Sequence, residues 1–139
     1  MKYVLDSNVA VKWVLPEPDS PKALALESDF RNQIHELISP DVLPIEIAHA
    51  LARAERKNIL LPGQAATRLA SVLGYPPDLF SYLPLLPRAM AIATKARIGV
   101  YDCLYVALAE REGCELVTAD QRLVNTFRGQ FPVVALSSI

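Results

Sequence analysis

Short apolar segments alternate with helical patterns along this chain, and this alternation restricts the possible folds more than any other feature. Residues 3–5, 36–39 and 115–118 have the length and apolar content of buried strands. Prolines, glycines and small polar residues separate them from segments with helical patterns. Strands that alternate with helices build a mainly parallel sheet that is covered on both faces. We therefore expect a three-layer α/β/α fold.

The rest of the sequence completes this layout. Helices are expected over residues 20–33, 41–57, 63–73, 88–97, 102–112 and 122–128, with one or two helical turns over 9–15. Two further short strands are expected near residues 79–83 and 131–136. Asp41 is the expected N-cap of the helix over 41–57. No linker or repeat interrupts the pattern, so residues 1–139 are expected to form one domain.

The charge balance limits the classes of partner. The chain has 14 Lys and Arg against 15 Asp and Glu, a formal net charge of −1, so bulk electrostatic attraction to nucleic acid is not expected. A nuclease is still compatible with this balance, because bound divalent ions cancel negative charge locally. The chain has five glycines and no glycine-rich phosphate loop, which argues against triphosphate hydrolysis and dinucleotide binding.

The sequence also predicts a cytoplasmic protein. The apolar run before Asp6 is too short for a signal peptide, and no apolar run approaches the roughly 20 residues of a membrane helix. Cys103 and Cys114 lack the spacing of a metal site. We expect both to be reduced and mostly buried thiols.

Four acidic residues stand in apolar surroundings, where a packed domain rarely keeps a carboxylate: Asp6, Glu46, Asp102 and Asp120. Asp6 and Asp120 each follow an expected strand. Their side chains should therefore reach the carboxyl edge of the parallel sheet, where folds of this class bind ligands. Carboxylates that converge there offer oxygen ligands to a hard cation such as Mg²⁺ or Mn²⁺.

Each acid also has an ordinary structural explanation. Asp6 and Asp102 could be helix N-caps, Glu46 could belong to the solvated face of a surface helix, and Asp120 could be a turn residue. The remaining acids mostly lie in polar segments or beside basic residues. The four taken together favour a cation site, because an unpartnered acid in a helix as apolar as that of Asp102 is costly to bury.

Four motifs surround these acids: Val-Leu-Asp-Ser-Asn at residues 4–8, Pro-Ile-Glu-Ile-Ala-His-Ala-Leu at 44–51, Tyr-Asp-Cys-Leu-Tyr-Val-Ala-Leu-Ala at 101–109 and Leu-Val-Thr-Ala-Asp at 116–120. With them the chain resembles the PIN-domain family, specifically the toxins of VapBC-type toxin–antitoxin pairs, over nearly its whole length. The third motif followed by Thr-x-Asp is the most specific part. Family members often have Asn in place of His49 and a small residue in place of Cys103.

The resemblance implies a Mg²⁺-dependent endoribonuclease, with Mn²⁺ as the other possible ion. Asp6 and Asp102 match its main metal ligands, and Glu46 and Asp120 complete the acidic quartet, either in the shell or through water. Two hydroxyl side chains match positions that support this site: Ser7 and Thr118. Basic or imidazole side chains are candidate contacts for RNA phosphates: Lys12, His49, Arg53, Lys95 and Arg97.

The same resemblance implies partners, namely a cognate antitoxin protein and a second copy of the chain in a homodimer. The apolar residues at 23–26 and 47–51 suit either an interface or the core. Two other functions stay open. One is a catalytically silent PIN fold that binds RNA or protein. The other is a metal-dependent phosphatase or DNA nuclease that uses the same carboxylates.

Overall fold

The computed structural model describes residues 1–139, and its centre is a five-stranded sheet. The strands are β1 (Lys2–Leu5), β2 (Glu36–Pro40), β3 (Asp78–Phe80), β4 (Glu115–Thr118) and β5 (Val133–Ala135). They lie in the order β3-β2-β1-β4-β5, and every neighbouring pair is parallel. The expected α/β fold with a mainly parallel sheet is therefore confirmed.

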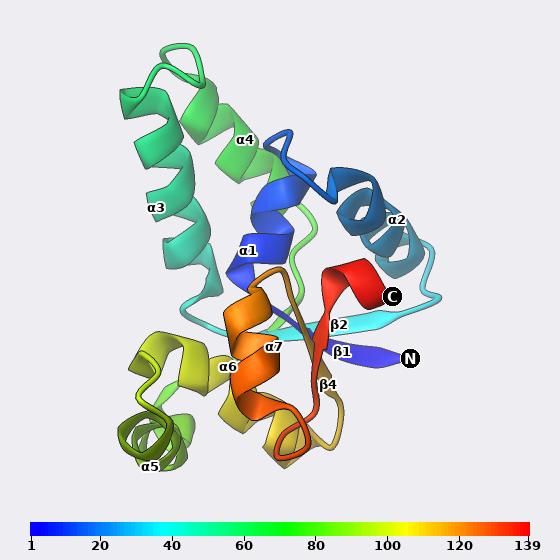
Figure 1. Cartoon of the computed structure of the whole chain (residues 1–139). Coiled ribbons are helices and arrows are strands. Elements are labelled where there is room, and N and C mark those ends of the chain that lie inside the picture. The colour runs from blue at the N-terminus through cyan, green and yellow to red at the C-terminus, as the bar shows by residue number, and fades with distance from the viewer.

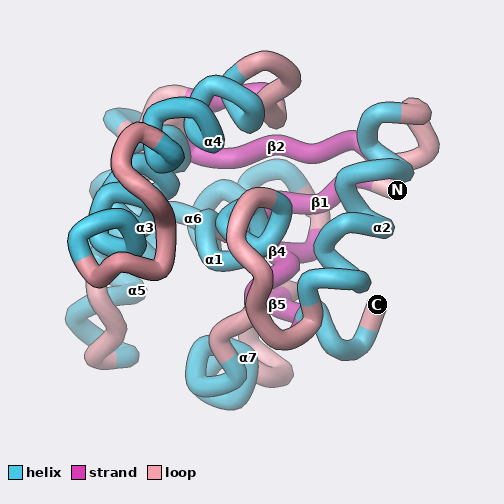
Figure 2. The backbone as a smooth tube through the Cα atoms, turned by 90° about the horizontal axis from the view of Figure 1, so that it is seen from above, coloured by secondary structure: helices cyan, strands magenta, loops and turns pink.

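Helices cover both faces of the sheet. The chain contains α1 (Ser7–Ala10), α2 (Ser20–Arg31), α3 (Leu43–Arg56), α4 (Gln64–Leu73), α5 (Leu86–Ala96), α6 (Val100–Glu112) and α7 (Gln121–Phe127). The chain places β2 and β3 in turn on one side of β1, and then β4 and β5 on its other side. The direction in which successive strands are added to the sheet therefore reverses after β3. Because parallel crossovers are right-handed, α1–α4 and α5–α7 then fall on opposite faces. Figure 1 shows α1–α4 above the strands and α5 and α6 below them, and Figure 2 shows the strands from above.

Helix α6 is the most enclosed helix of the fold. It packs against β1, β2 and β4 on one side and against α5 on the other. Every residue from 103 to 109 is buried, which agrees with the apolar sequence of this segment. A polar side chain within this stretch must find a partner inside the protein, since burying a polar group without a hydrogen bond is costly.

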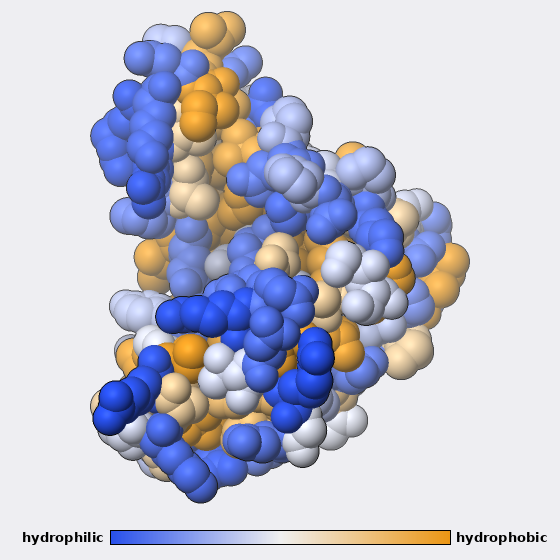
Figure 3. Space-filling model, viewed as in Figure 1, coloured by the Kyte–Doolittle hydropathy of each residue, from blue (hydrophilic) through white to orange (hydrophobic).

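Helices α3 and α4 pack against one another and extend away from the sheet as an arm (Figure 1). Exposed apolar side chains lie on this arm, and Figure 3 shows apolar atoms gathered there between polar ones. The segments at 23–26 and 47–51 contribute Ala23, Leu26, Ile47 and Leu51 to the core, while Leu24 is exposed.

The expected cap Asp41, the alternative explanation of Asp102 as a cap, and one expected strand are wrong in detail. The N-cap of α3 is Val42, and the Asp41 carboxylate accepts a hydrogen bond of 3.0 Å from the backbone N–H of Tyr82. The reason is that β2 and β3 are parallel neighbours, so the turns that follow them lie side by side. The strand expected at 79–83 therefore ends at Phe80. Helix α6 begins two residues early, after Gly99, so Asp102 lies in its first turn and does not cap it.

The two thiols differ in depth: Cys103 is buried and Cys114 is half-buried, and both are free. None of the helices has the length and apolar character needed to cross a membrane.

Candidate active site

Asp6 is the first residue beyond β1, and the sheet register places it beside the end of β4. Leu5 pairs with Val117, and the Asp6 N–H donates to the Val117 carbonyl over 3.2 Å. The side chain of Asp6 is buried, with 3% of the residue exposed. The Thr118 hydroxyl donates a hydrogen bond of 2.8 Å to Asp6 Oδ2. The strand edges thus hold this carboxylate in one orientation.

Asn8 completes the connection between the two strand ends, although the sequence analysis assigned it no role. Its Nδ2 donates to Thr118 Oγ1 over 3.1 Å, and its Oδ1 accepts from the Ala119 N–H over 3.0 Å. Ser7 is more weakly placed, with its hydroxyl 3.4 Å from Asp6 Oδ1. The only signal for Asn8 in the sequence was its position, two residues after Asp6 at the end of an expected strand.

Asp120 is both the N-cap of α7 and a wall of the site. Its Oδ1 accepts the backbone N–H groups of Arg122 and Leu123 over 3.0 and 3.3 Å. Its Oδ2 makes no hydrogen bond within the protein. The ordinary explanation of Asp120 as a polar residue in the turn before α7 is therefore correct for one oxygen, and the second oxygen stays available to a ligand.

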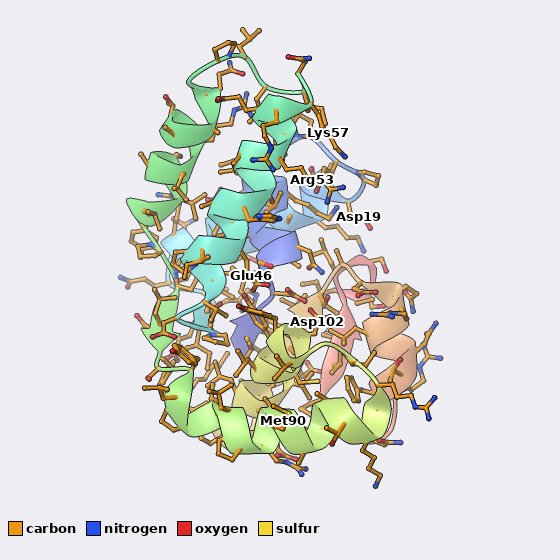
Figure 4. All side chains as sticks on the ribbon, turned by 90° about the vertical axis from the view of Figure 1, so that its left-hand side faces the viewer. Asp19, Glu46, Arg53, Lys57, Met90 and Asp102 are labelled. Carbon is orange, nitrogen blue, oxygen red and sulfur yellow. The ribbon has the colours of Figure 1, made fainter.

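Glu46 lies in the first turn of α3 and approaches the other acids from the arm. Figure 4 shows it close above Asp102, while Arg53 and Lys57 lie further along α3. The phenol of Tyr105 donates a hydrogen bond of 2.5 Å to Glu46 Oε1. Tyr105 belongs to the buried stretch of α6, so Glu46 is the partner that this buried hydroxyl requires.

The pKa values of the acids show that they share one local field. Burial raises the pKa of Asp6 to about 7, with Thr118 acting against this rise and Asp102 and Glu46 adding to it. Burial also raises the pKa of Glu46, which Tyr105 lowers and Asp102 raises. Each of these carboxylates therefore feels the negative charge of another.

Asp102 links the fourth acid to this group. Burial raises the pKa of Asp102, the neighbouring charge of Asp120 raises it further, and Arg122 on α7 lowers it. The structure therefore places each of the four acids predicted from the sequence within electrostatic reach of at least one other. Arg122, for which the sequence offers no signal, is the basic residue whose charge reaches Asp102.

A divalent cation suits the chemistry of this site. Carboxylate oxygens are the preferred ligands of Mg²⁺ and Mn²⁺. Burial is the main cause of the raised pKa values of Asp6, Glu46 and Asp102, and neighbouring carboxylates add to it, so a bound cation would favour the ionised forms. As the side chains stand, no three His, Cys, Asp or Glu groups are close enough to hold one ion. The residues therefore fit a divalent cation in the chemistry of their oxygen atoms and in their charge. To coordinate one ion together, the carboxylates would have to move closer to each other.

A groove of about 300 Å³ opens beside the carboxylates. It is lined by residues of α1, α3 and the turn before α7, together with the segment that follows α1: Ser7, Asn8, Val11, Lys12, Glu17, Glu46, Ala50, Ala119 and Asp120. Two of the four acids thus reach its wall. Lys12 is the basic residue of the groove, and its Nζ lies 3.5 Å from Glu17 Oε1.

The other candidate phosphate contacts lie further out. His49 and Arg53 are exposed on α3, one and two turns beyond Glu46. Lys95 lines a separate cavity of about 260 Å³ between α5 and α7. Arg97 follows the end of α5 with a left-handed backbone (φ 59°). The structure does not gather these four residues at the carboxylates, and their contact with RNA stays a prediction.

The fold and the site define a class of α/β protein with a parallel sheet and an acidic centre suited to a divalent cation. This centre lies at the ends of β1 and β4, where the order of the strands reverses. The model of the PIN domain family matches residues 3–127. The chain therefore belongs to the PIN-domain family, as its motifs predicted.

Curated and solved proteins agree with this assignment. Ribonuclease VapC3 of Pyrobaculum aerophilum is 33% identical over 129 residues, which cover 91% of this chain and 95% of the relative. The crystal structure of PAE2754 from Pyrobaculum aerophilum has a TM-score of 0.73 at 19% identity and covers 99% of this chain and 94% of its own. VapBC2 from Rickettsia felis, bound to a promoter DNA fragment, has a TM-score of 0.68 at 17% identity, with 97% and 98% covered. These two structures share the fold.

Proposed function

We propose that this chain is an endoribonuclease and the toxin component of a VapBC-type toxin–antitoxin pair. The observation that carries the proposal is the convergence of Asp6, Glu46, Asp102 and Asp120 at the carboxyl edge of the sheet. The likeness to ribonuclease VapC3 over nearly the whole of both chains supports RNA as the substrate. Such a toxin acts in the cytoplasm, where its RNA substrates are.

Mg²⁺ is the proposed cofactor, and Mn²⁺ can replace it. Asp6 and Asp102 would be the main ligands, with Glu46 and Asp120 completing the set. When bound, the ion supplies an activated water and relieves negative charge at the scissile phosphate. Thr118 holds the Asp6 carboxylate in orientation. In this proposal one of the two outer acids accepts the proton of the attacking water, and Asp120 is a candidate because its Oδ2 has no partner in the protein.

Basic side chains near the acids would hold the RNA backbone. Lys12 lines the groove, and Arg122 lies close enough to Asp102 to lower its pKa. Phosphate contacts of this kind position a nucleic acid without reading its sequence. His49 and Arg53 would extend the same path along α3.

The test is cleavage of RNA by the purified protein with Mg²⁺, with Mn²⁺ and with a chelator. Asp6→Asn and Asp102→Asn should each lower the cleavage rate by about 100-fold or more, because metal ligands act as a unit. Asp78→Asn is the matched control, since Asp78 is exposed at the start of β3, on the opposite edge of the sheet. Full activity in both site variants would refute the assignment.

A comparison of substrates separates the alternatives. Single-stranded DNA, duplex DNA and a phosphomonoester should be cleaved at least about tenfold more slowly than RNA. Faster cleavage of DNA or of the monoester would make the chain a DNA nuclease or a phosphatase. Tight binding of RNA without cleavage in either metal would make it a silent binding module.

An antitoxin is the proposed protein partner, together with a second copy of the chain. The arm of α3 and α4 exposes apolar side chains that a partner helix could cover: Ile59, Leu61 and Leu73 (Figure 3). Co-expression with the product of the neighbouring reading frame should yield a complex with reduced RNA cleavage. Light scattering of the chain alone should give the mass of a dimer.

A further inference from the structure

One side-chain hydrogen bond joins α3 to α6 at the carboxylate centre. Tyr105 is fully buried in α6, and its hydroxyl donates to Glu46 Oε1 over 2.5 Å. The other side-chain hydrogen bond from α3 joins Glu55 to the Ala65 N–H at the start of α4, within the arm itself. The bond between Tyr105 and Glu46 is therefore the single side-chain hydrogen bond from α3 to the body of the fold.

Glu46 needs such a restraint more than Asp6 and Asp120 do. Asp6 and Asp120 sit directly at strand ends and are held by hydrogen bonds from Thr118 and from the backbone of α7. Glu46 has one more rotatable bond than an aspartate and comes from the arm, which extends away from the sheet (Figure 1). Repulsion by Asp102 and solvation in the groove both favour its turning outward.

Tyr105 is suited to hold it. Tyr105 is fully buried on α6, which packs against β1, β2 and β4, so its side chain has little room to change position. Its hydroxyl reaches the carboxylate of Glu46 directly, with 2.5 Å between the phenol oxygen and Oε1.

We propose that Tyr105 is a positioning residue that holds Glu46 against the other carboxylates through Oε1 and leaves Oε2 free for a divalent cation. The inference rests on the proposed metal-dependent function. It predicts that the phenol hydroxyl acts on metal affinity through Glu46 alone. Partners that orient a metal ligand typically change metal affinity or activity by about 10–100-fold when removed.

The experiment measures Mn²⁺ affinity of the full chain without RNA, by the electron paramagnetic resonance signal of free Mn²⁺. Tyr105→Phe removes only the hydroxyl and should weaken Mn²⁺ binding by about tenfold. Tyr101→Phe is the matched control, because Tyr101 is on the same helix, 58% exposed and without a hydrogen-bond partner. It should bind Mn²⁺ like the wild type. In the RNA assay, raising the Mn²⁺ concentration should restore kcat of Tyr105→Phe, with KM for RNA unchanged.

A double-mutant cycle separates positioning of Glu46 from a general structural effect. In a Glu46→Gln background, Tyr105→Phe should change Mn²⁺ affinity by less than about twofold, because the shared effect is already lost. An unchanged affinity in Tyr105→Phe, or an equal loss in both backgrounds, would overturn the inference.

The outcomes also separate this inference from the proposed function. Mn²⁺ binding with the predicted coupling but no RNA cleavage would overturn the ribonuclease and leave the role of Tyr105 in place. RNA cleavage and Mn²⁺ binding that are both unaffected by removal of the Tyr105 hydroxyl would support the ribonuclease and overturn the role of Tyr105. A wild-type chain that binds no Mn²⁺ would overturn both.

Discussion

The hydroxyl of Thr118 donates a hydrogen bond of 2.8 Å to the buried carboxylate of Asp6, which joins the last residue of β4 to the first residue beyond β1. The same hydroxyl oxygen accepts from Asn8 Nδ2 and from the Asp120 N–H, each over 3.1 Å. Thr118 therefore lies at the centre of a network that connects two of the four acids. Its effect on Asp6 is to oppose the rise in pKa that burial causes.

Thr118→Val should destabilise the protein and weaken metal binding. Valine has nearly the same shape, but it leaves the Asp6 carboxylate without its donor and Asn8 without its acceptor. Of these two groups Asp6 is the buried one, and an unpaired buried polar group costs roughly 1–3 kcal/mol, so the free energy of unfolding at pH 8 should fall by about that amount. Urea unfolding measures the change. Thr118→Ser keeps the hydroxyl and should stay within about 1 kcal/mol of the wild type, and an equal loss in both variants would contradict the prediction.

The stability of the metal-free protein should fall as pH rises from about 4 to about 7. The pKa of Asp6 is about 7 in the folded state against an ordinary value of 3.8, so over this window the folded state holds a proton that the unfolded state has released. The free energy of unfolding should decrease by roughly 2–4 kcal/mol and then level off above pH 7. Thermal melts in a chelator across this pH range measure the slope.

Asp6→Asn is the control for this slope, because the variant has no proton to release at this position. Its stability should fall less steeply with pH than that of the wild type, with Glu46 and Asp102, whose pKa values burial also raises, causing the remaining slope, and it should exceed that of the wild type at pH 8. Saturating Mg²⁺ should reduce or reverse the slope of the wild type, since metal binding requires ionised carboxylates. A slope that is equally steep in Asp6→Asn would show that other groups cause it.

Much of the site was predictable from the sequence, because three of the four acids lie next to strand or helix patterns that fix their positions in the fold. Asp6 and Asp120 follow strand patterns, and the ends of parallel strands share one edge of a sheet. The apolar run around Asp102 indicated a buried helix, and α6 is the most enclosed helix of the fold. For these residues, local pattern and sheet topology together are sufficient.

The remaining contacts depend on packing between distant elements, which no local pattern encodes. Tyr105 and Glu46 are 59 residues apart, and their hydrogen bond exists because α3 and α6 meet at the sheet edge. Asp41 was expected to cap α3, but the turn after β3 competes for its carboxylate and takes it. In the same way, Arg122 reaches Asp102 only through the angle at which α7 leaves Asp120.

Substitutions of Asp120 should separate its two roles. Asp120→Asn keeps an oxygen that can accept the N–H groups of Arg122 and Leu123, so α7 stays capped. Asp120→Ala loses the cap and should lower the free energy of unfolding by about 1 kcal/mol. Both remove the carboxylate charge, so both should lower the RNA cleavage rate by about tenfold or more. Urea unfolding and RNA cleavage test this together, and an active Asp120→Asn would restrict Asp120 to its role as a cap.

Arg122 should contribute to RNA binding through its charge. It is exposed in the first turn of α7 and lies close enough to Asp102 to lower the pKa of that carboxyl. Loss of one phosphate contact reduces the salt dependence of binding by about one ion, so Arg122→Ala should raise KM for RNA and flatten the plot of log KM against log salt. Lys57→Ala is the control, since Lys57 is exposed at the far end of α3 from Glu46 (Figure 4). An unchanged salt dependence in Arg122→Ala would place the RNA backbone elsewhere on the surface.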